Sequence, residues 1–343
     1  MQLTLQGDIS PPKLTKKQRT AAAAARRAAA AETPIDHTPM TIHPDEERFR
    51  HGWWIEKRKL ILARLNESMT SGRIVESFAN CGANCVVEWS PTAQKFRLSA
   101  SYCHSRHCQA CMATRGNIIA ANLKQRLAEQ KKAIGTRANG QFKFICLTLK
   151  SSPAPLRDQI KHLYASFRKL RNMKLWKARI PGGAAFLEVT WNEKSRMWHP
   201  HLHLIAQGNF IDKRDLSAMW KQATGDSTIV DISEIKTEKD VAHYATKYVS
   251  KGCDLDIWQD PEAAAEWMCS LRGVRMCLTF GTWRGFKLTK AAQKYDDWTP
   301  RGHYLEILSR ARDGCDGSIA ILQRITKSET PEEVRSHYKM DAG

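Results

Sequence analysis

The segment "FLEVTWNEKSRMWHPHLHLI" at residues 186–205 decides the fold class, because two strand-like stretches flank a short polar turn. The first stretch is centred on Phe186–Trp191, and "NEKSRMW" separates it from the second, so we expect a β-hairpin. Side chains of a strand alternate between its two faces. Three histidines of the second stretch therefore share one face: His199, His201 and His203.

The sequence on either side extends this hairpin to a β-α-β-β-α-β order. A buried strand is expected at Phe142–Lys150, then a long amphipathic helix, and after the hairpin a short helix at Leu216–Ala223 and a strand in "STIVDISEIK". This order predicts an α+β fold, a ferredoxin-like (RRM-like) antiparallel sheet with helices on one face. The stretch "RMCLTFGTWRG" predicts a further strand of the same sheet.

The composition indicates an anionic partner. Lys and Arg number 54 against 35 Asp and Glu, a net charge of +19 over 343 residues. Such a balance favours nucleic acid or an anionic membrane surface. No apolar run approaches 18 residues, and "MQLTLQGDIS" lacks the features of a secretory signal, so we expect a cytoplasmic protein without a membrane partner.

The ten cysteines are not expected to form a disulfide framework in that compartment. "CGANC" and "CHSRHCQAC" place five of them within 31 residues, a spacing typical of a structural Zn²⁺ site with four thiolates. A redox role for the closely spaced last pair is the alternative. The expected zinc ligands are Cys81, Cys103, Cys108 and Cys111, with Cys85 as the competitor to Cys81.

A second constellation follows the last strand of the β-α-β-β-α-β order. The stretch "DVAHYATKYVSKG" predicts a helix on which Tyr244 and Tyr248 share a face, with Lys247 and Lys251 beside them. A tyrosine with a pKa near 10 is a poor nucleophile unless a cation or nearby lysines assist it. Half-buried packing of the two rings is the alternative interpretation.

The order of these motifs resembles the HUH endonucleases, and more closely the replication initiators (Rep proteins) of rolling-circle plasmids and phages. The residues that carry the resemblance are "FICLTLK", His201-Leu202-His203 and "HYATKYVSKG", and it covers about Cys81 to Gly285. It implies a metal-dependent nickase and strand transferase that acts on single-stranded or hairpin origin DNA. The implied product is a 5′-phosphotyrosine and a free 3′-hydroxyl that primes synthesis by host helicase and polymerase.

The resemblance also implies roles for the histidine strand. His201 and His203 would hold one Mg²⁺ or Mn²⁺, and Glu188 on the neighbouring strand is the expected third ligand because Mg²⁺ prefers oxygen. His199 lies just outside the motif, and we expect it to support these ligands or to contact DNA.

The motif alone does not decide which of the two tyrosines attacks first. Lys247-Tyr248-Val-Ser-Lys251 matches the usual nucleophile pattern, so we expect Tyr248 to attack first and Tyr244 second. The alternative alignment makes Tyr244 the nucleophile and Asp240 its acidic partner.

Four domains follow from these assignments. They are a disordered basic, alanine-rich arm (1–45), a helical zinc-binding module (46–135), an HUH endonuclease domain (136–290) and a C-terminal helical extension (291–343). A non-enzymatic DNA- or RNA-binding protein is the alternative function. It would need exposed aromatic residues on the central strands. A related transposase or relaxase is the other alternative.

Overall fold

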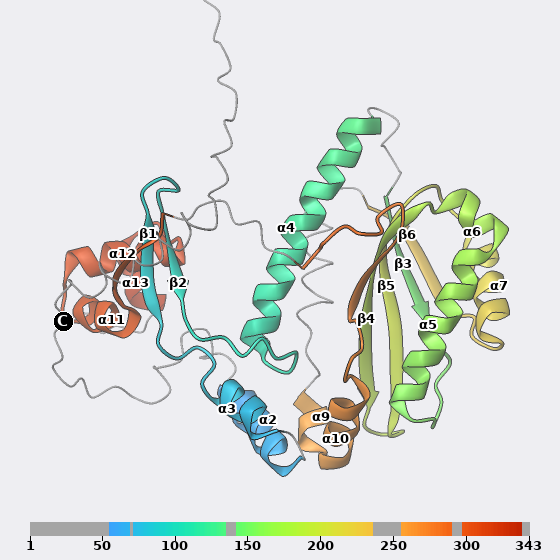
Figure 1. Cartoon of the computed structure of the whole chain (residues 1–343), viewed down its shortest axis with the longest axis horizontal. Helices are drawn as coiled ribbons and strands as arrows, with labels where there is room; N and C mark the ends of the chain where they lie inside the picture. The colour runs from blue at the N-terminus through green and yellow to red at the C-terminus, as the bar shows by residue number, and fades with distance from the viewer. Residues whose placement is uncertain (1–54, 69–70, 135–141, 236–254, 290–296, 338–343) are drawn as a thin grey trace, which may run out of the picture. The chain divides into compact units, whose positions relative to one another are not determined.

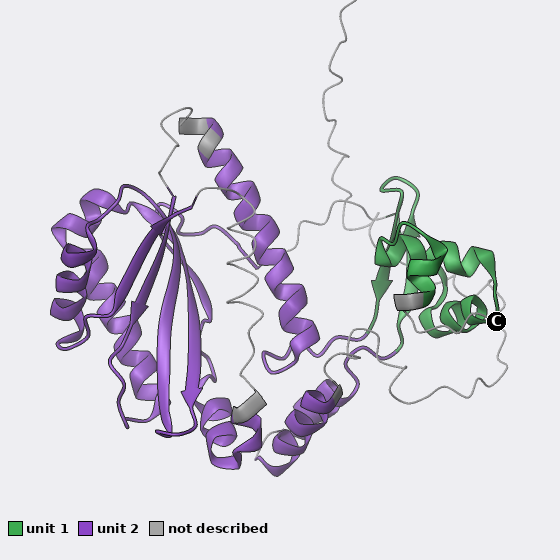
Figure 2. Cartoon of the chain, turned by 180° about the vertical axis from the view of Figure 1, so that it is seen from behind, with its two compact units in different colours: residues 1–47, 84–100, 294–343 green, residues 48–83, 101–293 purple. Residues whose placement is uncertain are grey.

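The computed structural model describes residues 55–68, 71–134, 142–235, 255–289 and 297–337. They form two compact units (Figure 2). The larger unit contains 55–83 and 101–289 of the described chain, and the smaller contains 84–100 together with 297–337. The predicted 46–135 module thus contributes residues to both units, and the four-domain division stays a prediction.

A five-stranded antiparallel sheet forms the centre of the larger unit (Figure 1). Its order is β6-β3-β5-β4-β7, and every neighbouring pair is antiparallel. The strands are β3 (Phe142–Thr148), β4 (Gly182–Asn192), β5 (Met197–Gln207), β6 (Val230–Glu234) and β7 (Cys277–Gly281). Hairpin β4–β5 and the extra edge strand β7 agree with the sequence-based prediction, as does the α+β class.

One face of this sheet is covered by α5 (Leu156–Asn172), α6 (Lys174–Arg179) and α7 (Lys213–Thr224). The apolar stripe of α5, which includes Leu163 and Phe167, is buried in one cluster with alternate residues of the strands. Burial of such a stripe is what holds an amphipathic helix in place.

The other face is not bare, so the prediction of helices on one face was wrong. Helix α4 (Gln109–Ile134) buries Ile119 and Leu123 in a second cluster with Phe186 and Ile205 of the sheet. The physical reason is that this face is apolar over half of its length. Only its other half carries the histidines.

The described residues of the larger unit form four further helices: α2 (Ile55–Glu67), α3 (Gly72–Ala79), α9 (Leu255–Gln259) and α10 (Pro261–Ser270). The guanidinium of Arg58 on α2 donates to the carbonyls of Phe78 and Ala79 at 2.9 and 2.7 Å. These carbonyls lie at the C-terminal end of α3, where the helix leaves acceptors without intrahelical partners. No helix in the described ranges is long and apolar enough to cross a membrane.

The part of the smaller unit that the structure describes is a three-stranded antiparallel sheet with three helices. Its strands, in the order β2-β1-β8, are β1 (Val86–Ser90), β2 (Lys95–Ser99) and β8 (Thr299–His303). Its helices are α11 (Tyr304–Arg312), α12 (Asp316–Thr326) and α13 (Pro331–His337). Thr330 caps α13 by accepting from the Glu333 amide at 3.2 Å.

Candidate functional site

The three histidines of β5 form a row on one face of the sheet. In the register of the β4–β5 hairpin, His199, His201 and His203 lie opposite Thr190, Glu188 and Phe186. Neighbouring ring centroids are 6.3 and 6.1 Å apart. The alternation expected from the sequence therefore brings all three imidazoles together.

Glu188 and His203 form the buried end of this row. The Nε2 of His203 lies 2.6 Å from Oε2 of Glu188, and the two side chains are only 8% and 9% exposed. A carboxylate buried to this extent is costly unless it is hydrogen-bonded, and the imidazole supplies that bond. Although Glu188 lies opposite His201 in the register, its carboxylate contacts His203, so it bridges the two positions.

His201 lies in the middle of the row between two threonine hydroxyls. Its Nδ1 is 3.0 Å from Oγ1 of Thr148, the last residue of β3, and its Nε2 is 3.5 Å from Oγ1 of Thr190 on β4. A fixed partner on one ring nitrogen sets the orientation of an imidazole and the availability of its other nitrogen. Neither threonine was predicted as a site residue from the sequence. The strand register could have identified both threonines, since each lies directly opposite a histidine.

His199 marks the open end of the row. Its ring contacts the hydroxyl of Ser151, with Nε2 at 3.1 Å. A cavity of about 570 Å³ opens here, next to His201 and the β4–β5 turn. Its lining residues are Thr190, Trp191, Asn192, Glu193, Lys194, His199 and His201. The row therefore runs from a buried carboxylate to a solvent-accessible cavity.

The nitrogen and oxygen atoms of this row are of the kinds that bind divalent cations. Two ligands of one ion in near-octahedral geometry lie about 3 Å apart, and the His203 nitrogen and Glu188 oxygen are 2.6 Å apart. A small separation of these two atoms would admit an ion. The ligand atoms of His201, His203 and Glu188 are farther apart as a set. Among the described residues, they do not form a group in which all ligand atoms lie within 4.8 Å of one another.

The predicted nucleophile helix cannot be placed beside this row. After β6, which ends at Glu234, the structure describes the chain as far as Ile235 and then again from Leu255. The residues concerned lie outside the described ranges: Asp240, Tyr244, Lys247, Tyr248 and Lys251. Their roles stay predictions.

Four cysteines of the larger unit form a second cluster. The sulfur of Cys81 lies 3.7 Å from that of Cys108 and 3.5 Å from that of Cys111, and Cys103 and Cys111 are 3.7 Å apart. Four thiolates at about 2.3 Å from a tetrahedral Zn²⁺ would be about 3.8 Å apart. This geometry could hold a metal ion.

Three separate pieces of chain supply these thiols. Cys81 follows α3, Cys103 lies in a loop, and Cys108 and Cys111 flank the start of α4. Amides of the loop point at the sulfurs, with Cys103 N 3.5 Å from Cys81 Sγ and Ser105 N 3.4 Å from Cys103 Sγ. Cys85, the expected competitor to Cys81, lies in the other unit.

The thiols of the cluster are poorly suited to ionise together without a cation. Hydrogen bonding to the thiol of Cys108, followed by the other two thiols and burial, raises the pKa of Cys103 far above its usual range. Thiolates bind metal only when deprotonated, so a bound cation would reverse this trend.

Comparison with known proteins concerns both the histidine row and the cysteine cluster. A family described as "Replication protein" matches residues 94–305, more than half of the chain. The chain belongs to this replication protein family. The matched span contains the histidine row and three of the four clustered cysteines, whereas Cys81 precedes it. The resemblance to replication initiators is therefore confirmed at the level of the family.

Individual relatives carry the name "Protein rep". The chain is 28% identical to one from Bacillus amyloliquefaciens over 48% of its own length and 51% of the relative, and 30% identical to one from Bacillus sp over 47% and 55%. It is 29% identical to a Staphylococcus aureus protein over 48% and 76%. The chain thus spans about half the length of the first two relatives. No solved structure matches it.

Proposed function

We propose that this replication protein initiates rolling-circle replication by nicking and rejoining single-stranded origin DNA. The observation that carries the proposal is the row of three imidazoles with a buried carboxylate, open to a cavity at one end, in a chain of the replication protein family. The HUH nuclease fold is part of this proposal, and the strand order of the sheet supports it.

In the proposed reaction the hydroxyl of Tyr248 or Tyr244 loses its proton to the surrounding water, and its oxygen forms a bond to the scissile phosphorus. The bond from phosphorus to the 3′ oxygen breaks, and that oxygen takes up a proton to become the free 3′-hydroxyl. The phosphodiester energy is kept in the phosphotyrosine, so the same chemistry run backwards rejoins ends. Lys247 and Lys251 would neutralise phosphate charge beside the nucleophile, and Asp240 is the acidic partner in the alternative alignment.

His201, His203 and Glu188 would hold a Mg²⁺ or Mn²⁺ ion, which supplies positive charge to a phosphate oxygen when bound. The chain itself prepares this position, because Thr148 orients His201 and Glu188 orients His203. His199 lines the cavity at the open end of the row, where it would contact the DNA.

We propose a structural Zn²⁺ for Cys81, Cys103, Cys108 and Cys111. The distances between the sulfurs support this ion. We also propose that host helicase and polymerase are partners and that the protein is cytoplasmic. The four-domain division expected from the sequence is a proposal as well.

A non-enzymatic nucleic-acid-binding sheet is less well supported by the structure. Binding by base stacking needs exposed aromatic side chains on the central strands. On β3 and β5 the aromatic Phe142 and Trp198 are 2% and 3% exposed, and the partly buried Phe144 of β3 packs against the cluster that includes α4. The open positions of the central sheet carry histidines instead.

The test is covalent capture. Purified protein would be mixed with labelled single-stranded origin DNA and Mn²⁺, and products resolved on denaturing gels. Tyr248→Phe, Tyr244→Phe, the double variant and His201→Ala would be compared with wild type. An adduct lost in one tyrosine variant and in His201→Ala supports the proposal and identifies the nucleophile. Tight binding without cleavage by wild type would contradict it.

A further inference from the structure

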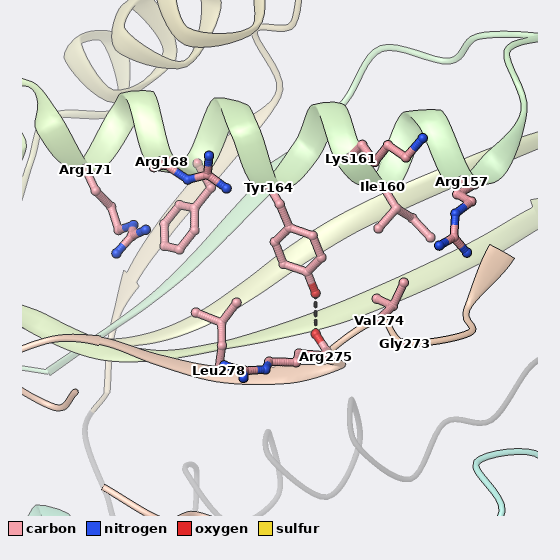
Figure 3. Close-up of a pocket in the computed structure, with 11 residues that line it drawn as sticks. Arg157, Ile160, Lys161, Tyr164, Arg168, Arg171, Gly273, Val274, Arg275 and Leu278 are labelled. Carbon is pink, nitrogen blue, oxygen red and sulfur yellow. Dashed lines mark hydrogen bonds between the residues drawn. The ribbon is translucent and has the colours of Figure 1, made fainter. Parts of the chain in front are cut away.

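A basic groove lies on the larger unit between α5 and the chain that leads into β7 (Figure 3). Its volume is about 400 Å³. Of the described residues that line it, none is acidic and five are basic: Arg157, Lys161, Arg168, Arg171 and Arg275. We call it the α5 groove.

The charges of the α5 groove are regularly spaced. Four of them lie on α5 at intervals of four, seven and three residues, which keeps them on one side of the helix next to its buried stripe. From Arg157 to Arg171 the helix rises about 21 Å at 1.5 Å per residue. That length corresponds to about six base-pair steps at 3.4 Å each.

The two walls of the groove are joined by hydrogen bonds. The hydroxyl of Tyr164 donates to the carbonyl of Arg275 at 2.5 Å across the groove (Figure 3). Arg157 Nη1 donates to the carbonyls of Cys269 at 3.2 Å and Arg272 at 3.4 Å. The position of the facing chain is therefore set by α5.

One residue that lines the groove, Arg171, has a half-buried side chain. The guanidinium of Arg171 lies over the rings of Phe167 and Phe280, and its Nε is buried without a hydrogen-bond partner. Burial, and then the charges of Arg284 and Arg168, lower the pKa of Arg171. An anion in the groove would offset this accumulation of like charge.

The α5 groove is separate from the histidine row. Its lining residue Leu278 pairs with Ala185, and both belong to the core beneath α5. The neighbouring pair, Phe186 and Cys277, belongs to the opposite face with His203. A ligand in the groove is therefore on the face of the sheet away from the row.

We propose that the α5 groove binds the phosphate backbone of duplex DNA that flanks the cleavage site. Duplex is favoured over single strands because the groove's aromatic side chains are not free to stack on bases: Phe167 is 1% exposed and the hydroxyl of Tyr164 is tied to Arg275. Contacts of this kind give affinity and position without reading sequence. The choice of DNA as the polyanion rests on the proposed function.

The experiment measures binding of the full chain to a labelled 20-base-pair duplex of arbitrary sequence by fluorescence anisotropy, without divalent cations, at several salt concentrations. Arg168→Glu/Arg275→Glu reverses two exposed charges of the groove. Arg214→Glu/Lys221→Glu makes the same change in net charge on exposed positions of α7. Circular dichroism would check that both variants are folded.

We expect the groove variant to bind at least 10-fold more weakly and its plot of log affinity against log salt to lose a slope of about 2, since each phosphate contact contributes about 0.9. The control should bind like wild type. Equal weakening in both variants would overturn the assignment, because it would indicate general electrostatics.

A second arm uses inorganic phosphate and a deoxynucleoside triphosphate as probes in thermal-shift measurements. Stabilisation of wild type but not of the groove variant, with duplex binding equal in both, would make the groove a small-phosphate site and overturn the DNA assignment. Binding is measured on DNA without an origin and without the catalytic ion. Failure of the nicking reaction and failure of this inference are therefore distinguishable.

Discussion

The histidine row and the cysteine cluster both gather metal-ligating side chains, but they do so in different ways. The row is built by strand register, and its polar atoms already have partners in the protein: Glu188 for His203 and Thr148 for His201. The cysteines come from two loops and a helix start and have mainly one another as partners. We infer that an ion at the row serves chemistry, whereas an ion at the cluster holds chain segments together.

The largest expected effect is on the cysteine cluster. Cys111→Ser should lower bound zinc from one equivalent towards none and lower the midpoint of thermal unfolding by 10 °C or more, because binding of structural Zn²⁺ is coupled to folding. Metal analysis and calorimetry measure both. Cys269→Ser, an exposed cysteine outside the cluster, is the matched control. If the two variants were equally stable, the cysteine cluster would not hold chain segments together through a bound ion.

The next effect is at the buried end of the row. His203→Ala removes a cation ligand of the proposed reaction and the 2.6 Å partner of the buried Glu188 carboxylate. We expect adduct formation to fall at least 100-fold and the free energy of unfolding to fall by about 1–3 kcal/mol. Single-turnover cleavage and urea unfolding measure these. The double variant His203→Ala/Glu188→Ala should recover part of the stability but none of the activity; recovery of activity would exclude both residues as ligands.

A smaller effect is expected at Thr148. Thr148→Val keeps the shape of the side chain but removes the hydroxyl 3.0 Å from His201 Nδ1. We expect the Mn²⁺ concentration for half-maximal cleavage to rise about 10-fold, with stability changed by less than about 1 kcal/mol. Serine at this position should restore the wild-type value. An unchanged Mn²⁺ dependence would show that the hydroxyl does not orient the imidazole.

The smallest effect concerns Asp297 in the smaller unit, a carboxylate held by hydrogen bonds rather than by an imidazole. Hydrogen bonds from Ser90 and then from the Thr92 amide lower the pKa of Asp297 to about 2. Because the folded pKa lies below that of the unfolded chain, Asp297 stabilises the fold above about pH 4, and this contribution is lost as the pH falls through about 2. Ser90→Ala should raise that pKa in an NMR titration of the carboxyl group; no change would refute the role of the hydroxyl.

The sheet could be predicted because its determinants are local. Alternation in β4 and β5 and the apolar spacing of α5 are visible within a few residues of sequence, and they also placed the three histidines on one face. The spacing of the cysteines likewise identified the four that meet.

What the sequence did not reveal depends on contacts between distant residues. The pairing of β1 with β8 joins Trp89 to Thr299, and no local pattern indicates it. The packing of α4 on the second face of the sheet depends on Phe186 and Ile205. The local sequence pattern predicts that these two residues lie in strands, but it does not predict which helix covers them. The hydroxyls beside His201 became recognisable only from the register of three strands.

The cysteine cluster also lies where the chain leaves the larger unit and returns to it. Cys81 precedes residues 84–100 and Cys103 follows them, and the amides of Gly82 and Ser101 donate to the carbonyls of Ser101 and Ala83 at 2.7 and 3.0 Å. The segment between is the hairpin β1–β2, whose partner β8 is made some 200 residues later during translation. This hairpin, joined at its base by these two backbone hydrogen bonds, is therefore synthesised long before the strand that completes its sheet.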